Sequence, residues 1–158
     1  MSDELQIRRV KAANDADVKS LIAKSDEYLS ALYSPESNHA ESLDALVAAG
    51  VALFAGYADG RIAACGGVKL VRERPPYGEI KRLFVDDAYR AKGFATVMMK
   101  YLENYLREYG VTICRLEAGP MQPQALRLYE KLGYRETGPF GAYEDDPQSV
   151  FLEKILPA

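Results

Sequence analysis

The sequence predicts a mixed α/β fold built on one β-sheet. Segments with strand-like and helix-like periodicity follow one another in the order β-α-α-β-β-β-α-β-α-β. Asp59 and Gly60 join two apolar, β-rich segments, and this pair is one of the strongest short signals for a hairpin. Helices alternate with strands only in the second half of the chain. This arrangement favours a mixed sheet over a fully parallel one.

The first part of the chain is expected to form a strand and two helices. Residues 5–10 alternate apolar and polar side chains, as a strand does. A helical pattern follows, with Asn14 as its expected N-cap, and Pro35 interrupts it. Residues 40–50 predict a second, shorter helix that ends at Gly50.

The remaining elements follow from periodicity and from glycine positions. Apolar residues at helical spacing predict a long amphipathic helix within 92–110, closed by Gly110. A short helix is expected to begin at Pro123 and to end at Gly133. The other strands are expected at 51–58, 61–71, 78–85, 111–118 and 149–156, with a further short one near 134–137.

Length and charge narrow the class of protein. A chain of 158 residues can bury a core within one domain, and it contains no repeat, linker or low-complexity tract. We therefore expect a single domain over residues 1–158. The net charge of −3 argues against a general nucleic-acid binder. The apolar runs are too short for a membrane span, and the first ten residues carry acids where a signal peptide would be basic. A cytoplasmic protein without a membrane or nucleic-acid partner is expected.

The cysteines and the histidine argue against two kinds of site. Cys65 and Cys114 each lie in an apolar, strand-like segment, which is typical of small buried side chains rather than nucleophiles. The single histidine, His39, excludes a multi-histidine metal site. The carboxylates show no ligand-like spacing either, so no metal is expected.

One basic turn is a candidate anion site. Arg90, Lys92 and Gly93 lie between an expected strand and the long helix. The first N–H groups of a helix have no partner, and the helix dipole favours negative charge there. Glycine allows a phosphate to approach the backbone closely. The alternative is an ordinary turn with solvated charges. The segment matches neither the Walker loop nor the dinucleotide-binding pattern.

The neighbouring residues make this turn more specific. The sequence RAKGFA at 90–95 fits the pattern Q/R-x-x-G-x-G/A, and EIKRLFVDDAY precedes it at 79–89. Residues 115–134 contain an A-x-x-L-Y-x-x-x-G-Y helix pattern. These segments resemble the acetyl-CoA signature, the fourth strand and the later helix of the GNAT family of N-acetyltransferases. The resemblance covers essentially the whole chain. Within the family, the chain resembles a bacterial subgroup whose acceptors are poorly defined. It implies a strongly twisted mixed sheet of six to seven strands with helices on both faces.

The resemblance also implies that acetyl-CoA is the co-substrate. Its pyrophosphate would contact the basic turn, and its pantetheine arm would lie along the fourth strand like an added strand. Gln122 occupies a position where the family often has an asparagine that contacts pantetheine. The contacts implied are Leu83, Phe84, Val85 and Gln122 for pantetheine, and Arg90, Ala91, Lys92, Gly93, Phe94 and Ala95 for pyrophosphate. Thr96 is also expected to contact the coenzyme.

Catalysis is expected to be a direct attack of an amine on the thioester. Tyr129 matches the tyrosine of the family's helix and would protonate the leaving thiolate, although it could instead be a core tyrosine. Glu79 and Glu117 match two base positions known among relatives. Either could be the general base, or the enzyme could have no dedicated side-chain base. A backbone N–H near Val85 is expected to stabilise the oxyanion.

The acceptor is expected to be a primary amine of a small molecule. Glu36, His39 and Tyr143 lie in segments that would border its pocket, although His39 could be an ordinary surface histidine. Two alternatives remain: an acyl-CoA-binding sensor or partner module without turnover, and an acetyltransferase for proteins or peptides. The transferred acyl group could also be longer than acetyl. The chain could form a homodimer, since members of this family often dimerise.

Overall fold

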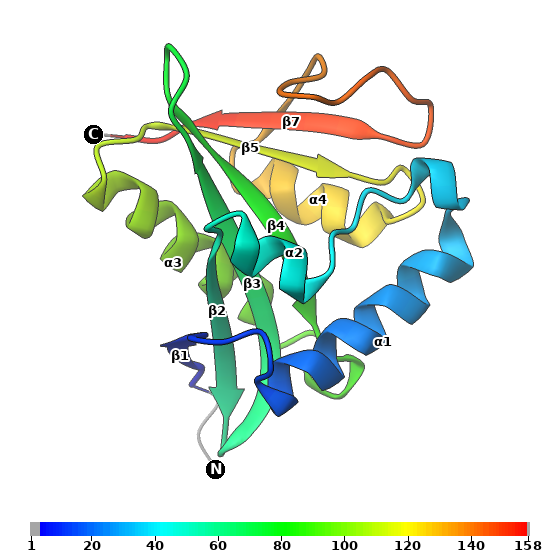
Figure 1. Ribbon diagram of the computed structural model, residues 1–158, viewed down its shortest axis with the longest axis vertical. Coiled ribbons are helices and arrows are strands. Elements are labelled where there is room, and N and C mark those ends of the chain that lie inside the picture. The colour runs from blue at the N-terminus through cyan, green and yellow to red at the C-terminus, as the bar shows by residue number, and fades with distance from the viewer. Residues whose placement is uncertain (1–3, 158) are drawn as a thin grey trace.

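The computed structural model describes residues 4–157, and the elements follow the predicted order (Figure 1). Residues 1–3 and 158, which the single-domain prediction includes, lie outside the described residues. The strands are β1 (Gln6–Arg9), β2 (Ala52–Ala58), β3 (Arg61–Val71), β4 (Tyr77–Val85), β5 (Ile113–Ala118), β6 (Arg135–Thr137) and β7 (Val150–Ile155). The helices are α1 (Ala16–Leu32), α2 (Leu43–Ala48), α3 (Phe94–Glu108) and α4 (Pro123–Lys131), with 3-10 turns η1 (Pro35–Ser37) and η2 (Asp87–Tyr89). Within residues 4–157, none of these helices has the length and apolarity needed to cross a membrane.

The seven strands form one mixed sheet in the order β1-β2-β3-β4-β5-β7-β6. Neighbouring strands are antiparallel except β4 and β5, which are parallel. The predicted mixed sheet is therefore confirmed, including the short strand β6. The Asp59 and Gly60 turn joins β2 to β3, and both residues have a positive φ, of 49° and 80°. This is the backbone that a tight two-residue hairpin requires.

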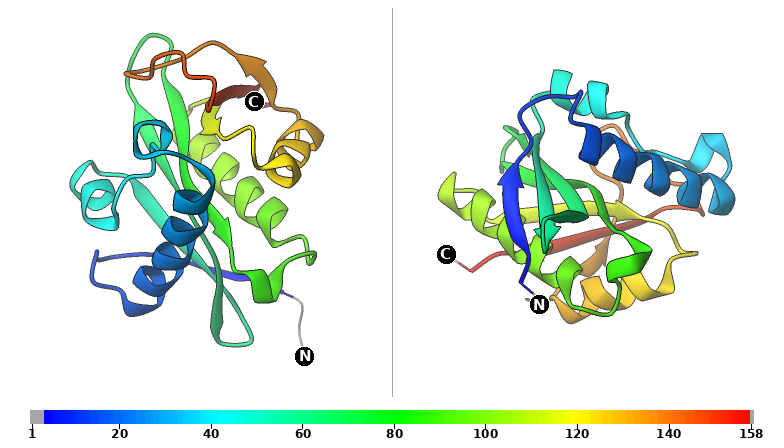
Figure 2. Two further views of the ribbon diagram at one scale, coloured as in Figure 1. Left: turned by 90° about the vertical axis from the view of Figure 1, so that its right-hand side faces the viewer. Right: turned by 90° about the horizontal axis from the view of Figure 1, so that it is seen from below.

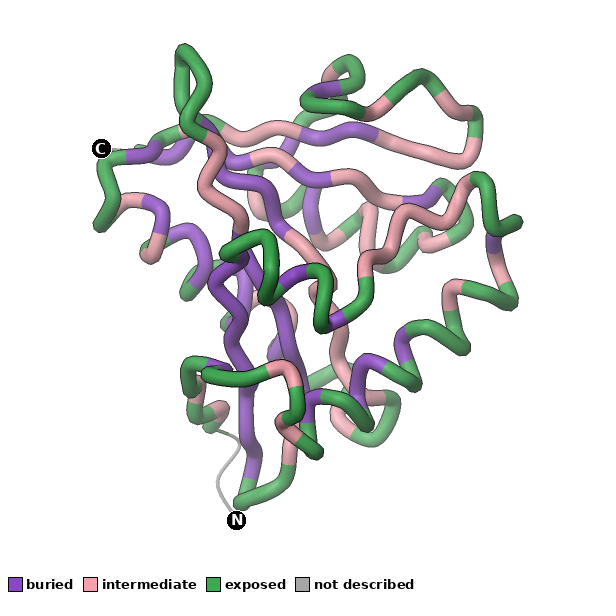
Figure 3. The backbone as a smooth tube through the Cα atoms, viewed as in Figure 1, coloured by how far each residue is buried: buried purple, intermediate pink, exposed green. Residues whose placement is uncertain are grey.

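Helices cover both faces of the sheet, as expected (Figure 2, right). On one face α3 and α4 pack against the strands, and this core includes Met98, Leu102 and Leu116. On the other face α1 and α2 cover β2 and β3 through residues such as Leu21 and Leu46. Buried positions accordingly follow the middle of the strands and the inner stripe of each helix (Figure 3).

One local prediction was wrong. Asp15 rather than Asn14 caps α1, because its carboxylate accepts a hydrogen bond from the N–H of Val18 at 3.1 Å. The N-cap residue directly precedes the first helical residue, which is Ala16, so Asn14 stands one residue too early. Both side chains are good caps, so residue type alone did not separate them.

The feature that creates the site is an incomplete pairing between β4 and β5. Gly78 and Glu79 of β4 pair with Cys114 and Arg115, and the register extends no further within the described residues. The pairing of β3 with β4 shifts by one residue just beyond this point, and Arg82 of β4 has a φ of 56°. Such a bulge bends a strand. The two strands consequently lie side by side at one end and separate toward the other (Figure 1).

Candidate active site

A cleft lies between the separated strands. Strand β4, the end of β5, α1, α4 and the two loops that contain His39 and Tyr143 line it. The structure brings together most of the side chains predicted to act in catalysis, in pantetheine binding or in acceptor binding. Those that line the cleft are Glu79, Leu83, Phe84, Glu117, Gln122, Tyr129, His39 and Tyr143. Glu36 is exposed and does not line it, and the basic turn at 90–96 lies beyond the end of β4.

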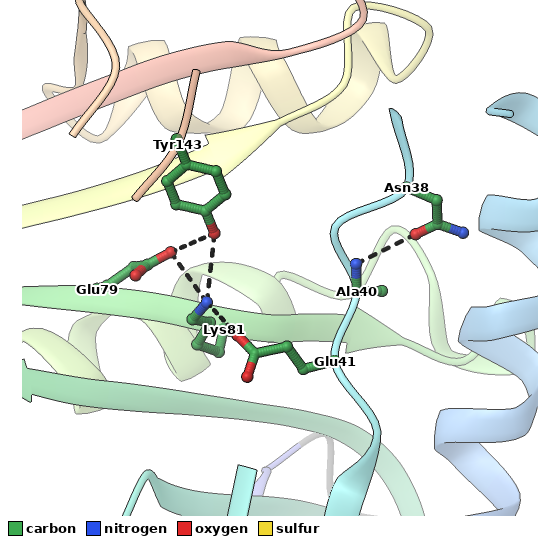
Figure 4. Close-up of polar contacts among 6 residues, drawn as sticks. All are labelled: Asn38, Ala40, Glu41, Glu79, Lys81 and Tyr143. Carbon is green, nitrogen blue, oxygen red and sulfur yellow. Dashed lines mark hydrogen bonds and ion pairs between the residues drawn. The ribbon is translucent and has the colours of Figure 1, made fainter. Parts of the chain in front are cut away.

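A lysine that the sequence analysis missed links Glu79 to Tyr143 on the side of the cleft that was predicted to bind the acceptor, which we call the acceptor side (Figure 4). Nζ of Lys81 lies 3.2 Å from Oε2 of Glu79, donates to the hydroxyl of Tyr143 at 3.3 Å and also contacts Glu41. The Tyr143 hydroxyl donates to Oε2 of Glu79 at 2.6 Å. We call these four residues the Lys81 cluster. Lys81 stands two residues after Glu79 on β4, so both side chains point to the same face, and this spacing could have indicated the pair, whereas nothing in the sequence pointed to Glu41.

The charges in the Lys81 cluster stabilise one another. Burial opposes the positive charge of Lys81, but hydrogen bonding to Glu41 and attraction by Glu79 outweigh it and raise the pKa of the lysine. Burial, together with the charge of Glu79, raises the pKa of Tyr143. Tyr143 therefore stays a protonated donor, and Glu79 is neutralised by a cation and held by a phenol.

Glu117, at the end of β5, has different surroundings. Burial is the main cause that raises the pKa of its carboxyl group, and it outweighs the hydrogen bond to Ser149 and the attraction by His39, which both lower the pKa. The ion-pairing groups of the Lys81 cluster bind Glu79 rather than Glu117. A half-buried carboxylate with a raised pKa takes up a proton more readily than an ion-paired one.

Tyr129 belongs both to the core and to the cleft. It is 8% exposed on α4, and its ring meets that of Tyr134 edge-on at 5.9 Å. Burial, followed by the nearby Cys114 and Glu117, raises the pKa of its phenol. The hydroxyl group therefore stays protonated through the neutral range, which a proton donor requires.

Two chain segments meet over the acceptor side of the cleft. The Ser37 hydroxyl donates to Oδ2 of Asp146 at 2.8 Å, and the His39 ring meets that of Tyr143 edge-on at 5.5 Å. These contacts join the segment 37–41, which follows α1, to the loop between β6 and β7. We call these joined segments the bridged roof.

The basic turn has the backbone of an anion site. Gly93 is the N-cap of α3 with a φ of 77°, it makes no side-chain cap, and a Cβ atom at this position would meet nothing within 4 Å. The first N–H groups of α3 therefore have no helical partner. Arg90 is already engaged, since its Nε donates to the carbonyl of Val85 at 3.1 Å and Nη2 lies 3.1 Å from Asp87. Its contact with a phosphate stays a prediction.

Neither cysteine is placed as a nucleophile. Cys65 and Cys114 are free and buried, and burial raises the pKa of each thiol to about 12. Among residues 4–157, no group of three or more histidine, cysteine, aspartate or glutamate side chains could hold a metal ion.

Comparisons with known proteins identify relatives of the chain. The profile of the family described as "Acetyltransferase (GNAT) family" matches residues 18–134. An IAA acetyltransferase of Azospirillum brasilense is 35% identical over 95% of this chain and 97% of the relative. The uncharacterized N-acetyltransferase YsnE of Bacillus subtilis is 30% identical over 88% and 92%.

Solved structures share the fold. A GNAT-family acetyltransferase of Staphylococcus aureus superimposes with a TM-score of 0.78 at 14% identity, over 98% of this chain and all of the other. A PaiA N-acetyltransferase of Thermoplasma acidophilum, solved in complex with coenzyme A, gives a TM-score of 0.72 at 16% identity, over 96% and 99%.

Proposed function

Because this chain belongs to the acetyltransferase (GNAT) family, we propose that it transfers the acetyl group of acetyl-CoA to the primary amine of a small molecule. The observation that carries this proposal is the cleft between β4 and β5, where a desolvated carboxylate and a buried phenol line the same space. These two groups have the opposite proton-transfer roles that the reaction needs. We further propose that the chain is a single domain, that it acts in the cytoplasm and that its reaction needs no metal.

The donor side of the cleft suits an extended ligand followed by phosphates. Beyond Glu79 the edge of β4 has no β5 partner within the described residues, so the backbone around Leu83, Phe84 and Val85 can pair with a chain of amides. The N-terminus of α3 lies farther along, at Gly93. In our proposal the pantetheine arm occupies the open edge, and the pyrophosphate binds the N–H groups of the turn.

The proposed reaction has no covalent enzyme intermediate. The acceptor nitrogen attacks the thioester carbon and loses a proton to Glu117, and a backbone N–H near Val85 stabilises the oxyanion. The carbon–sulfur bond then breaks, and the thiolate takes the phenolic proton of Tyr129. Solvent later returns a proton to the tyrosine and removes one from the glutamate.

The surroundings of the two glutamates favour Glu117 as the base. Oε2 of Glu79 already contacts the Lys81 ammonium and accepts a hydrogen bond from the Tyr143 hydroxyl, so it is less free than Glu117 to meet the acceptor nitrogen. We therefore assign Glu79 to shaping the acceptor side. If the pH dependence of turnover stays the same in both Glu117→Gln and Glu79→Gln, the reaction has no dedicated side-chain base.

The bridged roof favours a small acceptor over a protein. A peptide segment needs an open groove, but the Ser37–Asp146 hydrogen bond and the contact of His39 with Tyr143 join the two segments that would flank one. A thiol-release assay with acetyl-CoA tests this across amines, amino acids and peptides. Release of coenzyme A with small amines alone supports the proposal. Faster release with peptides would move the activity to protein acetylation, and binding without release would indicate a coenzyme sensor.

A further inference from the structure

Tyr33 connects two elements on opposite sides of the cleft. It is the C-cap of α1, is 8% exposed, and lines the cleft together with Gln122. Its hydroxyl accepts a hydrogen bond from the N–H of Met121 at 3.1 Å and donates one to Oε1 of Gln122 at 3.2 Å. The phenol of α1 thus binds the loop between β5 and α4 through both a backbone and a side-chain group.

These contacts fix the direction of the Gln122 amide. Its Oε1 also accepts a hydrogen bond from the N–H of Gly119 at 3.3 Å. Gln122 is the N-cap residue of α4, yet its side chain makes no cap hydrogen bond. A glutamine amide has one oxygen acceptor and one NH₂ group with two donors. Because the oxygen already has two protein donors, the NH₂ group is the part left to meet a ligand.

A steric observation supports the same arrangement independently. A Cβ atom at Gly119 would lie 1.7 Å from the Tyr33 hydroxyl oxygen and 2.0 Å from the ring carbon that bears it. The ring therefore occupies the space that any side chain at position 119 would need. Tyr33 and Gly119 are matched in shape, and the contact holds the end of α1 against the loop.

We propose that Tyr33 is a positioning residue for the coenzyme. By holding Oε1 of Gln122, it presents the NH₂ group of that side chain to a carbonyl oxygen of an extended, amide-containing ligand in the cleft. In the proposed function, which this inference presupposes, that ligand is the pantetheine arm of acetyl-CoA. Tyr33 acts through Gln122 and takes no part in the chemistry.

The test compares coenzyme A affinity with turnover in Tyr33→Phe. The substitution keeps the ring and removes the hydroxyl group, so the Gln122 amide can rotate. We expect the Kd for coenzyme A, measured by calorimetry, to rise about 3- to 10-fold, the worth of roughly one hydrogen bond. The kcat at saturating acetyl-CoA should change less than about 2-fold. In a Gln122→Ala background the same substitution should have no further effect on Kd.

Tyr57→Phe is the matched control. It also removes a tyrosine hydroxyl that binds α1, through Oδ2 of Asp17 at 3.1 Å, but Tyr57 lies outside the cleft. Both variants should lose similar stability, and only Tyr33→Phe should weaken coenzyme binding. An unchanged Kd in Tyr33→Phe, or an undiminished effect in the Gln122→Ala background, overturns the inference. If the wild-type chain binds no coenzyme A, the proposed function itself fails.

Discussion

Nζ of Lys81 lies 3.2 Å from Oε2 of Glu79, and these side chains are only 11% and 8% exposed. A buried carboxylate beside a buried ammonium group is part of the architecture, because neither charge can lose its partner without a large penalty. This pair therefore separates two roles that the sequence left equivalent. In our proposal Glu79 shapes the acceptor side of the cleft, and Glu117 is the base.

Removing the lysine charge should destabilise the fold. Lys81→Met leaves Glu79 buried without its cation, and we expect the free energy of unfolding in denaturant to fall by about 3 kcal/mol. A second substitution, Glu79→Gln, should recover much of the loss. Lys24→Met is the control, since it breaks an exposed pair with Asp86 and should change stability little. Equal losses in the two lysine variants would contradict a buried ion pair.

Replacing the proposed base should abolish the acidic limb of the pH profile. Glu117→Gln should lower kcat by about 10²- to 10⁴-fold. In the wild type, kcat/KM should fall as the pH drops through the Glu117 pKa, which burial raises above the ordinary glutamate value. Glu79→Gln should keep that limb and mainly raise the KM of the acceptor. A limb that persists in Glu117→Gln removes this assignment.

Glu117→Gln should also make the protein more stable near neutral pH. Since the pKa of Glu117 is raised by folding, its contribution to stability is complete below the unfolded value of about 4.3 and is lost as the pH rises through the folded value. Glutamine does not titrate and avoids that loss. Thermal melts should show Glu117→Gln above the wild type at pH 7, with the gap shrinking below about pH 4. A constant gap would mean that burial of the charge is not the cause.

Tyr129→Phe should separate chemistry from binding. The phenol is buried on α4 and stays protonated, so its loss removes the proton donor while the ring still packs against Tyr134. We expect kcat to fall about 10²-fold or more, with the Kd for coenzyme A nearly unchanged. An unaltered kcat would leave Tyr129 as a core tyrosine.

The proposed binding of pyrophosphate at the basic turn can be probed at its glycine. Gly93→Ala places a Cβ at a φ of 77° in otherwise open space, so it should cost about 1 kcal/mol of stability. Gly60→Ala in the β2–β3 hairpin is a matched control, with a φ of 80° and equally open surroundings. Both should lose similar stability, but only Gly93→Ala should raise the KM for acetyl-CoA. Equal KM values in the two variants would place the pyrophosphate elsewhere.

Much of the fold was predictable because the signals are local. Period-two and helical patterns, the Asp59 and Gly60 turn and the glycines after helices together predicted each strand and α-helix, but not the 3-10 turns η1 and η2. The mixed sheet followed from the order of those elements. Only the cap of α1 was misplaced, since Asn14 and Asp15 are chemically similar.

The site was predictable only in part, because its decisive contacts join distant segments. Glu79, Glu117 and Tyr129 stand in recognisable motifs and do line one cleft. The partners that distinguish the glutamates come from elsewhere, as Glu41 reaches Lys81 across 40 positions. Periodicity also cannot show where two paired strands separate.

The open edge of β4 bears on the tendency of the protein to aggregate. Unpaired strand edges usually recruit other strands and lead to aggregation. Here the edge lies in the cleft. Tyr28 of α1 and its C-cap Tyr33 line the cleft, as do Ala125 and Tyr129 of α4. Such a slot admits one slender chain and excludes a second sheet. We therefore expect the same walls that suit a thread-like ligand to hinder strand pairing between copies at this edge.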